Sequence, residues 1–415
     1  MKIALLGYGK EGKSTEAYFK KHYENLECDI FENFTYSEIK QKDFEKYNYV
    51  FRSPSVPPLH LPNETSVTKY FFDHCPCEII GVTATKGKGT TCSFIKALLD
   101  AENADVYLVG NIGAPALDIL DNLSKISVVV YEMSSFQLWD LEKSPHIAVL
   151  GQLEPDHLNV HKDYEDYLNA KANITNFQSK NDYLIYYQDN PETTKIASHS
   201  KAITIPYPFA IDTEVKSAIP LPGNHNLNNA LAAIAAVASH KNISPDEYLR
   251  EYKTSIMAGL QSFHGLPHRL EFIRNYKNIK FYDDNFATNI SSTRVAIDSF
   301  PEANITIIVG GRDKTNNADL PALYEILTAP QIKHIILLGE SGHALAENFS
   351  DPRFTLADTL QDAIKLSLEK ALAYQSAHQN SENIVLMSPA AASFDMFENV
   401  YDRGVQFQAL VKNLR

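Results

Sequence analysis

Short apolar runs alternate with amphipathic segments along almost the whole chain. Runs typical of buried strands occur at Ile3–Leu6, Asp29–Phe31, Tyr49–Phe51, Glu78–Thr83, Asp105–Val109, Ile126–Tyr131, His146–Leu150, Lys280–Asp284, Ile305–Val309, His334–Leu338 and Ile384–Met387. Apolar side chains recur at helical spacing in segments 12–21, 92–99, 163–177, 227–239 and 358–374. Continuous apolar strands separated by helices are typical of parallel sheets covered on both faces. The pattern predicts an α/β fold in three successive segments, 1–66, 67–264 and 265–415.

A glycine-rich stretch, Gly81-Val-Thr-Ala-Thr-Lys-Gly-Lys-Gly-Thr-Thr91, joins the strand at 78–83 to the helix at 92–99. In a phosphate-binding loop, backbone N–H groups and the helix N-terminus surround the phosphates, and a lysine adds a mobile positive charge. The spacing departs from GxxxxGK(S/T), because Gly81 lies one residue early and Gly89 directly follows Lys88. Thr90 or Thr91 would then supply the hydroxyl for Mg²⁺. An ordinary turn that contains a lysine is the alternative.

The first strand is followed by Gly7-Tyr-Gly-Lys-Glu-Gly12, and Glu32 comes after the second strand. This is the pattern of a dinucleotide-binding fingerprint. Three interpretations stay open: a nicotinamide cofactor, the diphosphate of another nucleotide, and a purely structural turn. The diphosphate is favoured over nicotinamide, because a second nucleotide loop follows closely and no hydride-transfer residues accompany the turn.

Two strands of the middle segment end in groups that could bind a metal. Ile126–Tyr131 leads into Glu132, and His146–Leu150 leads to His157. A carboxylate and a neutral imidazole beside nucleotide phosphates could complete a Mg²⁺ or Mn²⁺ shell. His157 alone would more often be a loop histidine. Periodicity alone predicts that Lys171, on the amphipathic helix at 163–177, is exposed to solvent.

The last segment offers two further cations. Lys314 follows the tight Gly310-Gly311 turn, where it could present its charge to a carboxylate or phosphoryl oxygen, and a surface turn is the alternative. Arg269 could contact a nucleotide at a domain junction, or form an interdomain ion pair.

Composition narrows the class. The 415 residues carry a net charge of −13 without a Lys/Arg-rich block, which argues against a nucleic-acid surface. No apolar run reaches the roughly 18 residues of a membrane-spanning helix, and the first strand is too short for a signal peptide. Four cysteines form no paired framework. A cytoplasmic protein without membrane attachment is expected.

The motifs together resemble the Mur ligase family over essentially the whole chain. The segments that carry the resemblance are Thr85-Lys-Gly-Lys88, Gly110-Asn-Ile-Gly-Ala-Pro-Ala-Leu117, Glu132-Met-Ser-Ser-Phe-Gln-Leu138, Glu154-Pro-Asp-His157, Gly223-Asn-His-Asn226, Gly265-Leu-Pro-His-Arg269, Ala287-Thr-Asn289, Gly310-Gly-Arg-Asp-Lys314 and Ser388-Pro-Ala-Ala-Ala-Ser-Phe-Asp395. Within the family they look most like the members that add D-glutamate.

The resemblance implies three domains: a UDP-binding Rossmann-like unit at 1–66, a central P-loop ATPase with a mostly parallel sheet at 67–264, and a C-terminal Rossmann-like unit at 265–415. It implies a monomeric ATP-dependent ligase of peptidoglycan synthesis that needs Mg²⁺ or Mn²⁺. ATP would phosphorylate the carboxylate of UDP-N-acetylmuramoyl-L-alanine, and the amine of D-glutamate would attack the acyl phosphate. Closure of the domains around junctions near 66 and 264 is expected.

Motif positions carry over the family's site residues. The implied ATP-binding residues are Thr85, Lys86, Gly87, Lys88, Gly89, Thr90, Thr91, Asn229, Arg269 and Asp284. The implied metal-binding residues are Thr90, Glu132, His157 and Lys171, with Lys171 as a carbamate. The implied substrate-binding residues are Gly7, Gly9, Lys10, Glu11, Gly12, Glu32, Asn111, Ser134, Gln137, Thr288, Lys314, Ser393 and Phe394. Lys88, Glu132, His157, Lys171 and Lys314 would serve the chemical step.

Some positions depart from the family pattern. Ala84 and Lys86 replace the residues usual in the phosphate loop, Ser55 replaces a glycine, Phe286 removes a cation, and Val400 stands where an aromatic residue is expected. The added amino acid is therefore the least determined feature. A ligase for another amino acid, a folate-type ligase and a catalytically silent UDP-sugar or nucleotide sensor are the alternatives.

Overall fold

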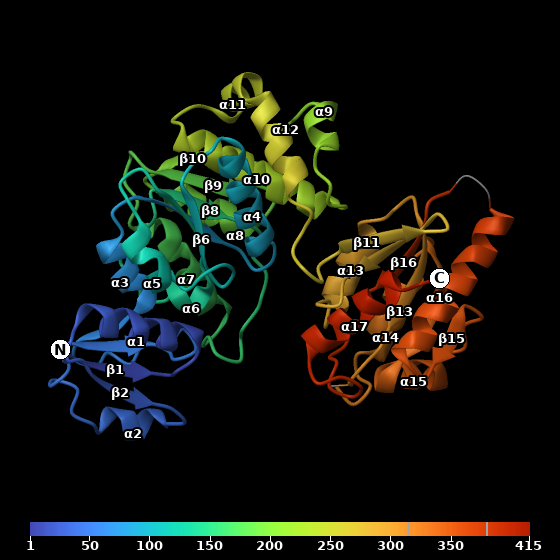
Figure 1. Cartoon of the computed structure of the whole chain (residues 1–415), viewed down its shortest axis with the longest axis horizontal. Helices are drawn as coiled ribbons and strands as arrows, with labels where there is room; N and C mark the ends of the chain where they lie inside the picture. Colours follow the sequence, from blue (N-terminus) through green and yellow to red (C-terminus); the bar gives the residue numbers. More distant parts are fainter. Residues whose placement is uncertain (314, 379–380) are drawn as a thin grey trace. The chain divides into compact units, whose positions relative to one another are not determined.

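The computed structural model describes residues 1–313, 315–378 and 381–415. The described chain forms two compact units (Figure 1). The first comprises residues 1–220 and 225–263, and the second comprises 221–224 and 264–415. The first unit contains two β-sheets and the second contains one.

The sheet nearest the N-terminus has four parallel strands in the order β2-β1-β3-β4. Its strands are β1 (Lys2–Leu6), β2 (Glu27–Phe31), β3 (Tyr49–Arg52) and β4 (Glu64–Ser66), and its helices are α1 (Lys10–His22) and α2 (Tyr36–Lys40). Residues Ala4 and Leu5 of β1 lie in different apolar clusters. Because successive strand residues point to opposite faces, both faces of this sheet are covered.

The central sheet has six parallel strands in the order β10-β9-β8-β5-β7-β6. Its strands are β5 (Glu78–Thr83), β6 (Val106–Gly110), β7 (Val128–Glu132), β8 (Ile147–Leu150), β9 (Tyr183–Tyr187) and β10 (Ile203–Tyr207). Its helices are α3 (Val67–His74), α4 (Lys88–Ala101), α5 (Ala116–Ile119), η1 (Leu120–Asn122), α6 (Ser135–Leu138), α7 (Tyr164–Asn176), α8 (Pro191–His199), α9 (Thr213–Ser217), α10 (Asn224–His240), α11 (Pro245–Glu251) and α12 (Lys253–Ser262). Strand β5, which leads into the glycine-rich loop, lies between β8 and β7.

The C-terminal sheet has the order β11-β12-β16-β13-β14-β15, in which only the β11–β12 pairing is antiparallel among the described strands. Its strands are β11 (Glu271–Tyr276), β12 (Ile279–Asp283), β13 (Asn304–Val309), β14 (Ile332–Leu338), β15 (Phe354–Ala357) and β16 (Asn383–Met387). Its helices are α13 (Ile290–Asp298), α14 (Leu320–Leu327), α15 (Gly339–Asn348), α16 (Leu360–Ala377) and α17 (Val400–Lys412). Neighbouring Ile307 and Ile308 pack into separate clusters, so helices cover both faces.

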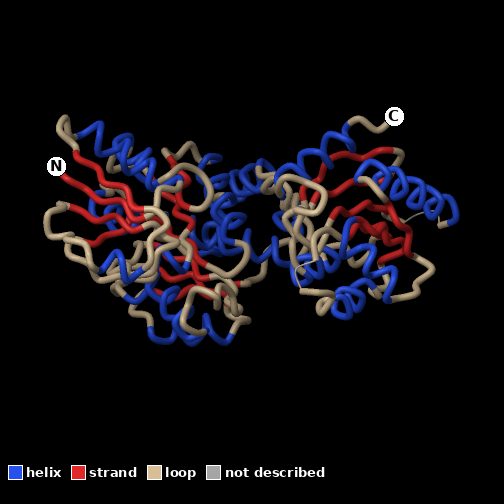
Figure 2. The backbone as a smooth tube through the Cα atoms, turned by 90° about the horizontal axis from the view of Figure 1, so that it is seen from below, coloured by secondary structure: helices blue, strands red, loops and turns tan. Residues whose placement is uncertain are grey.

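The α/β class and the mostly parallel sheets are confirmed, and in each sheet the strands run side by side with helices along them (Figure 2). Strand β7 begins two residues later than expected, at Val128, because Ile126 is 83% exposed and cannot belong to the buried run. Helix α4 begins at Lys88, earlier than the apolar periodicity from 92 indicated. Among the described residues, no helix combines the length and hydropathy needed to cross a membrane. The boundaries at 66 and 264 stay predictions.

Candidate active site

The glycine-rich loop leaves the central strand β5 and turns directly into α4. Gly87 caps the helix in the left-handed region, with φ of 83°. A Cβ on Gly87 would lie 2.6 Å from Oδ1 of Asn229, so the position has no room for a side chain. Thr91 also donates to this Asn229 oxygen, at 3.2 Å. Asn229, which is distant in sequence, therefore lies against the loop, and its contact with the nucleotide stays a prediction.

Two lysines converge on one carbonyl of this loop. Nζ of Lys88 donates to the carbonyl oxygens of Ala84 and Thr85, at 2.8 and 2.9 Å. Nζ of Lys171 donates to the same Ala84 oxygen at 2.9 Å and to Oγ1 of Thr83 at 3.0 Å. Lys171 is only 1% exposed, which makes the solvated interpretation of this lysine wrong. Burial, together with the nearby Lys88 ammonium, lowers the pKa of Lys171 well below its usual value.

Thr85 fastens the loop to the segment that follows β8. Its hydroxyl lies 2.7 Å from the Tyr167 hydroxyl, and it also bonds the backbone N–H and carbonyl of Glu154. Lys86 points to the same segment, with its Nζ 3.9 Å from a Glu154 oxygen. These contacts hold the loop between β5 and α7.

The expected metal ligands follow neighbouring strands. Glu132 is the buried last residue of β7 and is paired in register with Val82 of β5, and His157 lies beyond the end of β8. Because β8, β5 and β7 are adjacent and parallel, their carboxyl ends form one edge. His157 has φ of 54°, and its ring lies 5.0 Å from the Phe136 ring.

The two threonines of the loop differ in environment. Thr91 is buried, and its hydroxyl is taken by Asn229, whereas Thr90 is half-buried in the first turn of α4, next to Gly89. A hydroxyl, a carboxylate and an imidazole form a donor set that fits Mg²⁺ or Mn²⁺. This difference favours Thr90 as the hydroxyl donor.

The first glycine turn borders a cavity of about 670 Å³ in the N-terminal part. Gly7, Gly9 and Glu32 line it, together with Tyr8, Asn33, Phe34, Thr35, Tyr36, Ser53, Ser55 and Val56. Gly12 lies in α1, where a Cβ would approach the Gly7 carbonyl oxygen to 2.8 Å. The turn and the acidic residue are thus brought together, as the fingerprint predicted.

Lys10 and Glu11 do not line this cavity and instead contact the segments that follow strands β6 and β7 of the central sheet. Nζ of Lys10 donates to the Gly113 carbonyl at 3.1 Å. Oε1 of Glu11 accepts from Nε2 of Gln137 at 2.9 Å. Burial raises the pKa of Glu11, and the bond from Gln137 partly offsets this effect.

Short helix α6 carries the predicted muramoyl contacts. Ser134 caps the helix, its Oγ accepting from the Gln137 N–H at 3.3 Å while its own N–H donates to Oε1 of Gln137 at 2.9 Å. Gln137 is buried, and Asn111, which follows β6, is exposed.

In the second unit, a buried carboxyl lies at the end of β12. Asp284 accepts from Oγ of Ser388 at 2.8 Å and from the Leu270 N–H at 3.2 Å. Burial raises the pKa of Asp284 to about 7. The Arg269 guanidinium lies over the Phe286 ring, 5.4 Å from its centroid. Phe286 therefore places an aromatic ring where the family pattern has a cation, and the Arg269 guanidinium contacts that ring.

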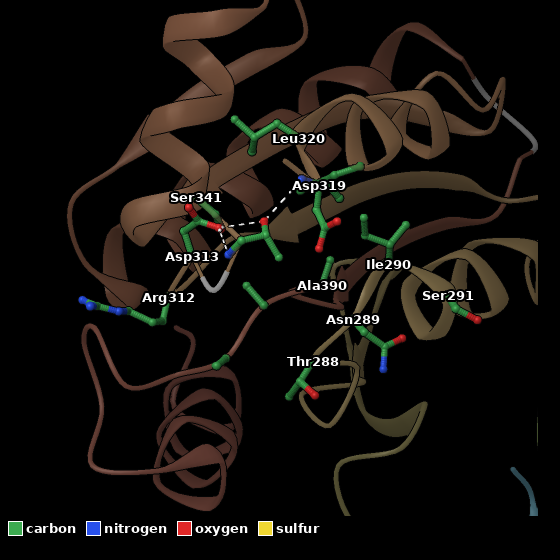
Figure 3. Close-up of a pocket in the computed structure, with 14 residues that line it drawn as sticks. Thr288, Asn289, Ile290, Ser291, Arg312, Asp313, Asp319, Leu320, Ser341 and Ala390 are labelled. Atoms are coloured by element: carbon green, nitrogen blue, oxygen red, sulfur yellow. Dashed lines mark hydrogen bonds between the residues drawn. The ribbon is translucent and has the colours of Figure 1, made fainter. Parts of the chain in front are cut away.

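A cavity of about 580 Å³ opens at the same end of the C-terminal sheet (Figure 3). Thr288 lines it, with Asn289, Ile290, Ser291, Arg312, Asp313, Thr315, Asp319, Leu320, Leu323, Ser341 and Ala390–Ala392. The Asp319 carboxylate points into the opening, whereas Arg312 extends away from it and pairs with Glu340 (Figure 3). Ser393 is buried directly after the lining alanines, Phe394 is exposed, and Lys314 lies outside the described residues.

Some residues around these sites were not among the predictions. Buried Arg403 of α17 donates to the carbonyls of Asn285 and Ala391, each at 3.1 Å, and so holds two strand-end loops. Burial lowers the pKa of Arg403 to about 10. Buried His161 was not among the predictions either. Its position four residues after His157 is the feature of the sequence that could have pointed to it.

Comparison with known proteins agrees with this arrangement. Residues 82–237 match the Mur ligase middle domain, and residues 268–390 match the Mur ligase glutamate ligase domain. The chain is 30% identical to UDP-N-acetylmuramoylalanine--D-glutamate ligase of Clostridium tetani, over all of this chain and 97% of that protein. The chain belongs to the Mur ligase family.

Solved structures share the fold of this Mur ligase at low identity. MurC, the UDP-N-acetylmuramate-alanine ligase of Thermotoga maritima, superposes with a TM-score of 0.57 and 17% identity, covering 99% of each chain. A folylpolyglutamate synthase of Mycobacterium tuberculosis superposes with a TM-score of 0.59 and 14% identity, covering 84% of this chain and 96% of that one. At these identities the likeness concerns the fold alone.

Proposed function

We propose that this Mur ligase joins D-glutamate to UDP-N-acetylmuramoyl-L-alanine and converts ATP to ADP and phosphate, as a step of peptidoglycan precursor synthesis. The observation that carries the proposal is the convergence of Lys88 and Lys171 on the Ala84 carbonyl, at the strand edge that also presents Glu132. We place the enzyme in the cytoplasm, where ATP and the UDP-linked substrate are found, and expect it to act as a monomer.

On the nucleotide side, the loop supplies positive charge and backbone N–H groups. Lys88 would leave the carbonyls of Ala84 and Thr85 to meet the β- and γ-phosphates, while the N–H groups of Gly87, Gly89 and the first turn of α4 surround them. Asn229 fixes the loop by its close approach to Gly87. By resemblance, Arg269 and Asp284 would also be nucleotide contacts.

The donor set beside the loop fits a divalent metal. Thr90, Glu132 and His157 would hold Mg²⁺ or Mn²⁺, which neutralises phosphate charge when bound. Lys171 is suited to become a carbamate, because a lowered pKa raises the fraction of neutral amine, which is the form that attacks carbon dioxide. The carbamate would turn a buried amine into an anionic oxygen ligand.

The reaction has two displacements. A carboxylate oxygen of the muramoyl substrate attacks the γ-phosphorus, forms the new P–O bond, and releases ADP. The neutral amine of the amino acid then attacks the acyl carbon of this acyl phosphate, and the tetrahedral intermediate expels phosphate as the amine loses a proton. The chain contributes positioning and charge neutralisation.

The remaining predicted residues would bind the UDP-linked substrate and the incoming amino acid. The N-terminal cavity at Gly7, Gly9 and Glu32 would take the UDP moiety, with Lys10, Glu11 and Gly12 shaping the turn beside it. Asn111, Ser134 and Gln137 would contact the muramoyl part. The residues around Thr288, Lys314, Ser393 and Phe394 would hold the incoming amino acid.

A second candidate is a ligase that adds a different amino acid. Phe286 favours it, because its ring lies against Arg269 and Tyr401 where the D-glutamate members carry a lysine. The test is phosphate release from ATP and UDP-N-acetylmuramoyl-L-alanine with D-glutamate, L-glutamate, D-aspartate or other amino acids. We expect release with D-glutamate. Phosphate release only with another amino acid would identify that amino acid as the substrate that the enzyme adds. No release with any amino acid would contradict the proposed ligase activity.

A further inference from the structure

A three-residue hydrogen-bonded chain lies behind the edge of the central sheet. Nδ1 of His161 is 2.9 Å from a carboxylate oxygen of Asp166, and Nε2 of His161 is 2.9 Å from Oγ of Ser135. Because a carboxylate only accepts, Nδ1 carries the proton, and Nε2 accepts the Ser135 hydroxyl proton. Ser135 and His161 are each 2% exposed.

These contacts link two segments that the proposed reaction uses. Ser135 begins α6, and Asp166 lies in the first turn of α7, which packs against α6 (Figure 1). The same α6 contributes Gln137, which reaches Glu11 of the diphosphate turn. His161 therefore fixes the helix that carries Gln137, one of the predicted substrate contacts.

An aromatic stack extends the chain to His157. The Phe136 ring stacks on His161 with centroids 5.3 Å apart and planes 6° apart, and it lies 5.0 Å from the His157 ring. The backbone N–H of His161 also donates to the His157 carbonyl at 3.0 Å, which closes the turn in which His157 has φ of 54°. The side chain of His157 is 48% exposed, and its Nε2 lies 3.6 Å from a carboxylate oxygen of the neighbouring Asp156. This turn and the Phe136 face are the supports that connect His157 to His161.

We propose that His161 is a positioning residue: held by Asp166, it bonds Ser135 and stacks on Phe136, and thereby sets the His157 imidazole for the metal–nucleotide complex. The inference rests on the proposed function, because it assigns His157 to that complex. Groups that orient a metal-binding histidine typically contribute ten- to a hundredfold to metal affinity.

A Ser-His-Asp chain also suggests a nucleophilic serine. Burial argues against this role here, because the Ser135 hydroxyl is enclosed and the flat face of His161 is covered by Phe136. The hydrogen-bonded chain of Ser135, His161 and Asp166 therefore orients the residues around it, and no covalent bond forms at Ser135.

The test uses the full-length enzyme and Mn²⁺ binding measured by electron paramagnetic resonance with a non-hydrolysable ATP analogue. Ser135→Ala and His161→Gln should raise the Mn²⁺ dissociation constant about tenfold. The matched control is His146→Gln, which breaks a His146–Asp182 pair at the opposite, amino end of β8. Unchanged Mn²⁺ affinity in both test variants would overturn the proposal, as would an equal loss in the control.

Trp139, the single tryptophan of the chain, reports on the fold around the site. Its ring centroid is 4.3 Å from that of His161, so an unchanged emission spectrum in Ser135→Ala would show that the stack is intact while metal affinity falls. Asp166→Asn retains an acceptor for Nδ1 and should bind Mn²⁺ more tightly than Asp166→Ala. An emission spectrum of exposed tryptophan in Ser135→Ala, or equal Mn²⁺ affinity in the two Asp166 variants, would assign Ser135 and Asp166 a merely structural role and overturn the proposal.

Two further outcomes are decisive. Covalent labelling of Ser135 by a fluorophosphonate would make it a nucleophile and overturn the positioning role. The Mn²⁺ titration needs no turnover, so a wild-type enzyme that releases no phosphate with any amino acid contradicts the proposed function without deciding this inference.

Discussion

A buried ionisable group lies beside a strand end in each unit of the molecule, Lys171 of α7 in the first and Asp284 in the second, and the two groups carry opposite charges when ionised. In the first unit, the Lys171 amine lies among oxygen acceptors of the phosphate loop. In the second, the Asp284 carboxyl lies among donors from Ser388 and Leu270. Burial disfavours the charged form of both, lowering the pKa of Lys171 and raising that of Asp284.

The two groups therefore make stability depend on pH in opposite directions. Below the ordinary lysine pKa of 10.5, Lys171 is protonated in the unfolded chain, whereas burial disfavours its protonation in the folded chain. The contribution of Lys171 to stability therefore falls as the pH is lowered. The folded chain keeps a proton on Asp284 up to a pKa of about 7, whereas the unfolded chain releases it near 3.8. The contribution of Asp284 is thus lost as the pH rises between these values.

The largest expected effect is at Lys88, which shares the Ala84 carbonyl with Lys171. Lys88→Ala should lower phosphate release by about 10³-fold or more, because the cation that meets the transferred phosphoryl group is lost. Binding of the UDP-linked substrate, measured by calorimetry, should persist. Lys96→Ala is the control, since this lysine of the same helix α4 pairs with Asp100 on the surface at 2.7 Å. Full turnover in Lys88→Ala would contradict the assigned phosphate loop.

Asp284→Asn removes the titrating carboxyl of the second unit. Relative to the variant, the wild type should lose up to about 4 kcal/mol of unfolding free energy between pH 4 and pH 7, the range between its unfolded and folded pKa values. Urea unfolding across this range measures the difference. A difference that does not change with pH would show that Asp284 ionises normally.

Lys171→Met tests the opposite pH dependence of stability, which is expected in the first unit. Relative to the variant, the wild type should lose about 1.4 kcal/mol per pH unit as the pH is lowered, wherever the folded amine is neutral. Turnover should fall about a hundredfold, because the carbamate cannot form. Unfolding is measured in buffer free of carbon dioxide, which keeps the amine unmodified. A wild-type advantage that grows at lower pH would reverse the sign of the comparison.

The smallest expected effect is at Ser388, whose hydroxyl donates to Asp284. Ser388→Ala should cost about 1 kcal/mol at pH 7 and raise the pKa of Asp284 further, because this bond stabilises the carboxylate. The matched control is Ser367→Ala, since buried Ser367 donates to a helix carbonyl at 2.6 Å and contacts no acid through its hydroxyl. The pH midpoint of the stability loss should move upward only in Ser388→Ala.

Much of the architecture could be predicted from local pattern. The strands at Glu78–Thr83 and Ile305–Val309 are continuous apolar runs, and the helix at 163–177 shows clear periodicity, so their existence depends on neighbours in sequence. The turns with Gly7 and Gly87 were also visible in the sequence, because glycine supplies the positive φ that each turn needs. The ordered motifs then identified the family.

Lys171 shows what the pattern could not decide. It shares a helix face with Tyr167 and Ile174, yet its charge favours solvent. The acceptors on Thr83 and Ala84 and the Tyr167 ring, whose centroid lies 5.0 Å from the lysine Nζ, explain its burial. Those acceptors lie about ninety positions away. The same holds for Asn229 against Gly87 and for His161 against Ser135.

The sequence by itself determined the elements, the two glycine turns and the family, because these follow from residue types at short spacing. The tertiary structure decided which strand ends meet, since the order β8-β5-β7 joins segments that no local periodicity connects. It also decided which ionisable groups are buried. Burial sets their pKa values, because desolvation depends on every neighbour that excludes water and not on the residue alone.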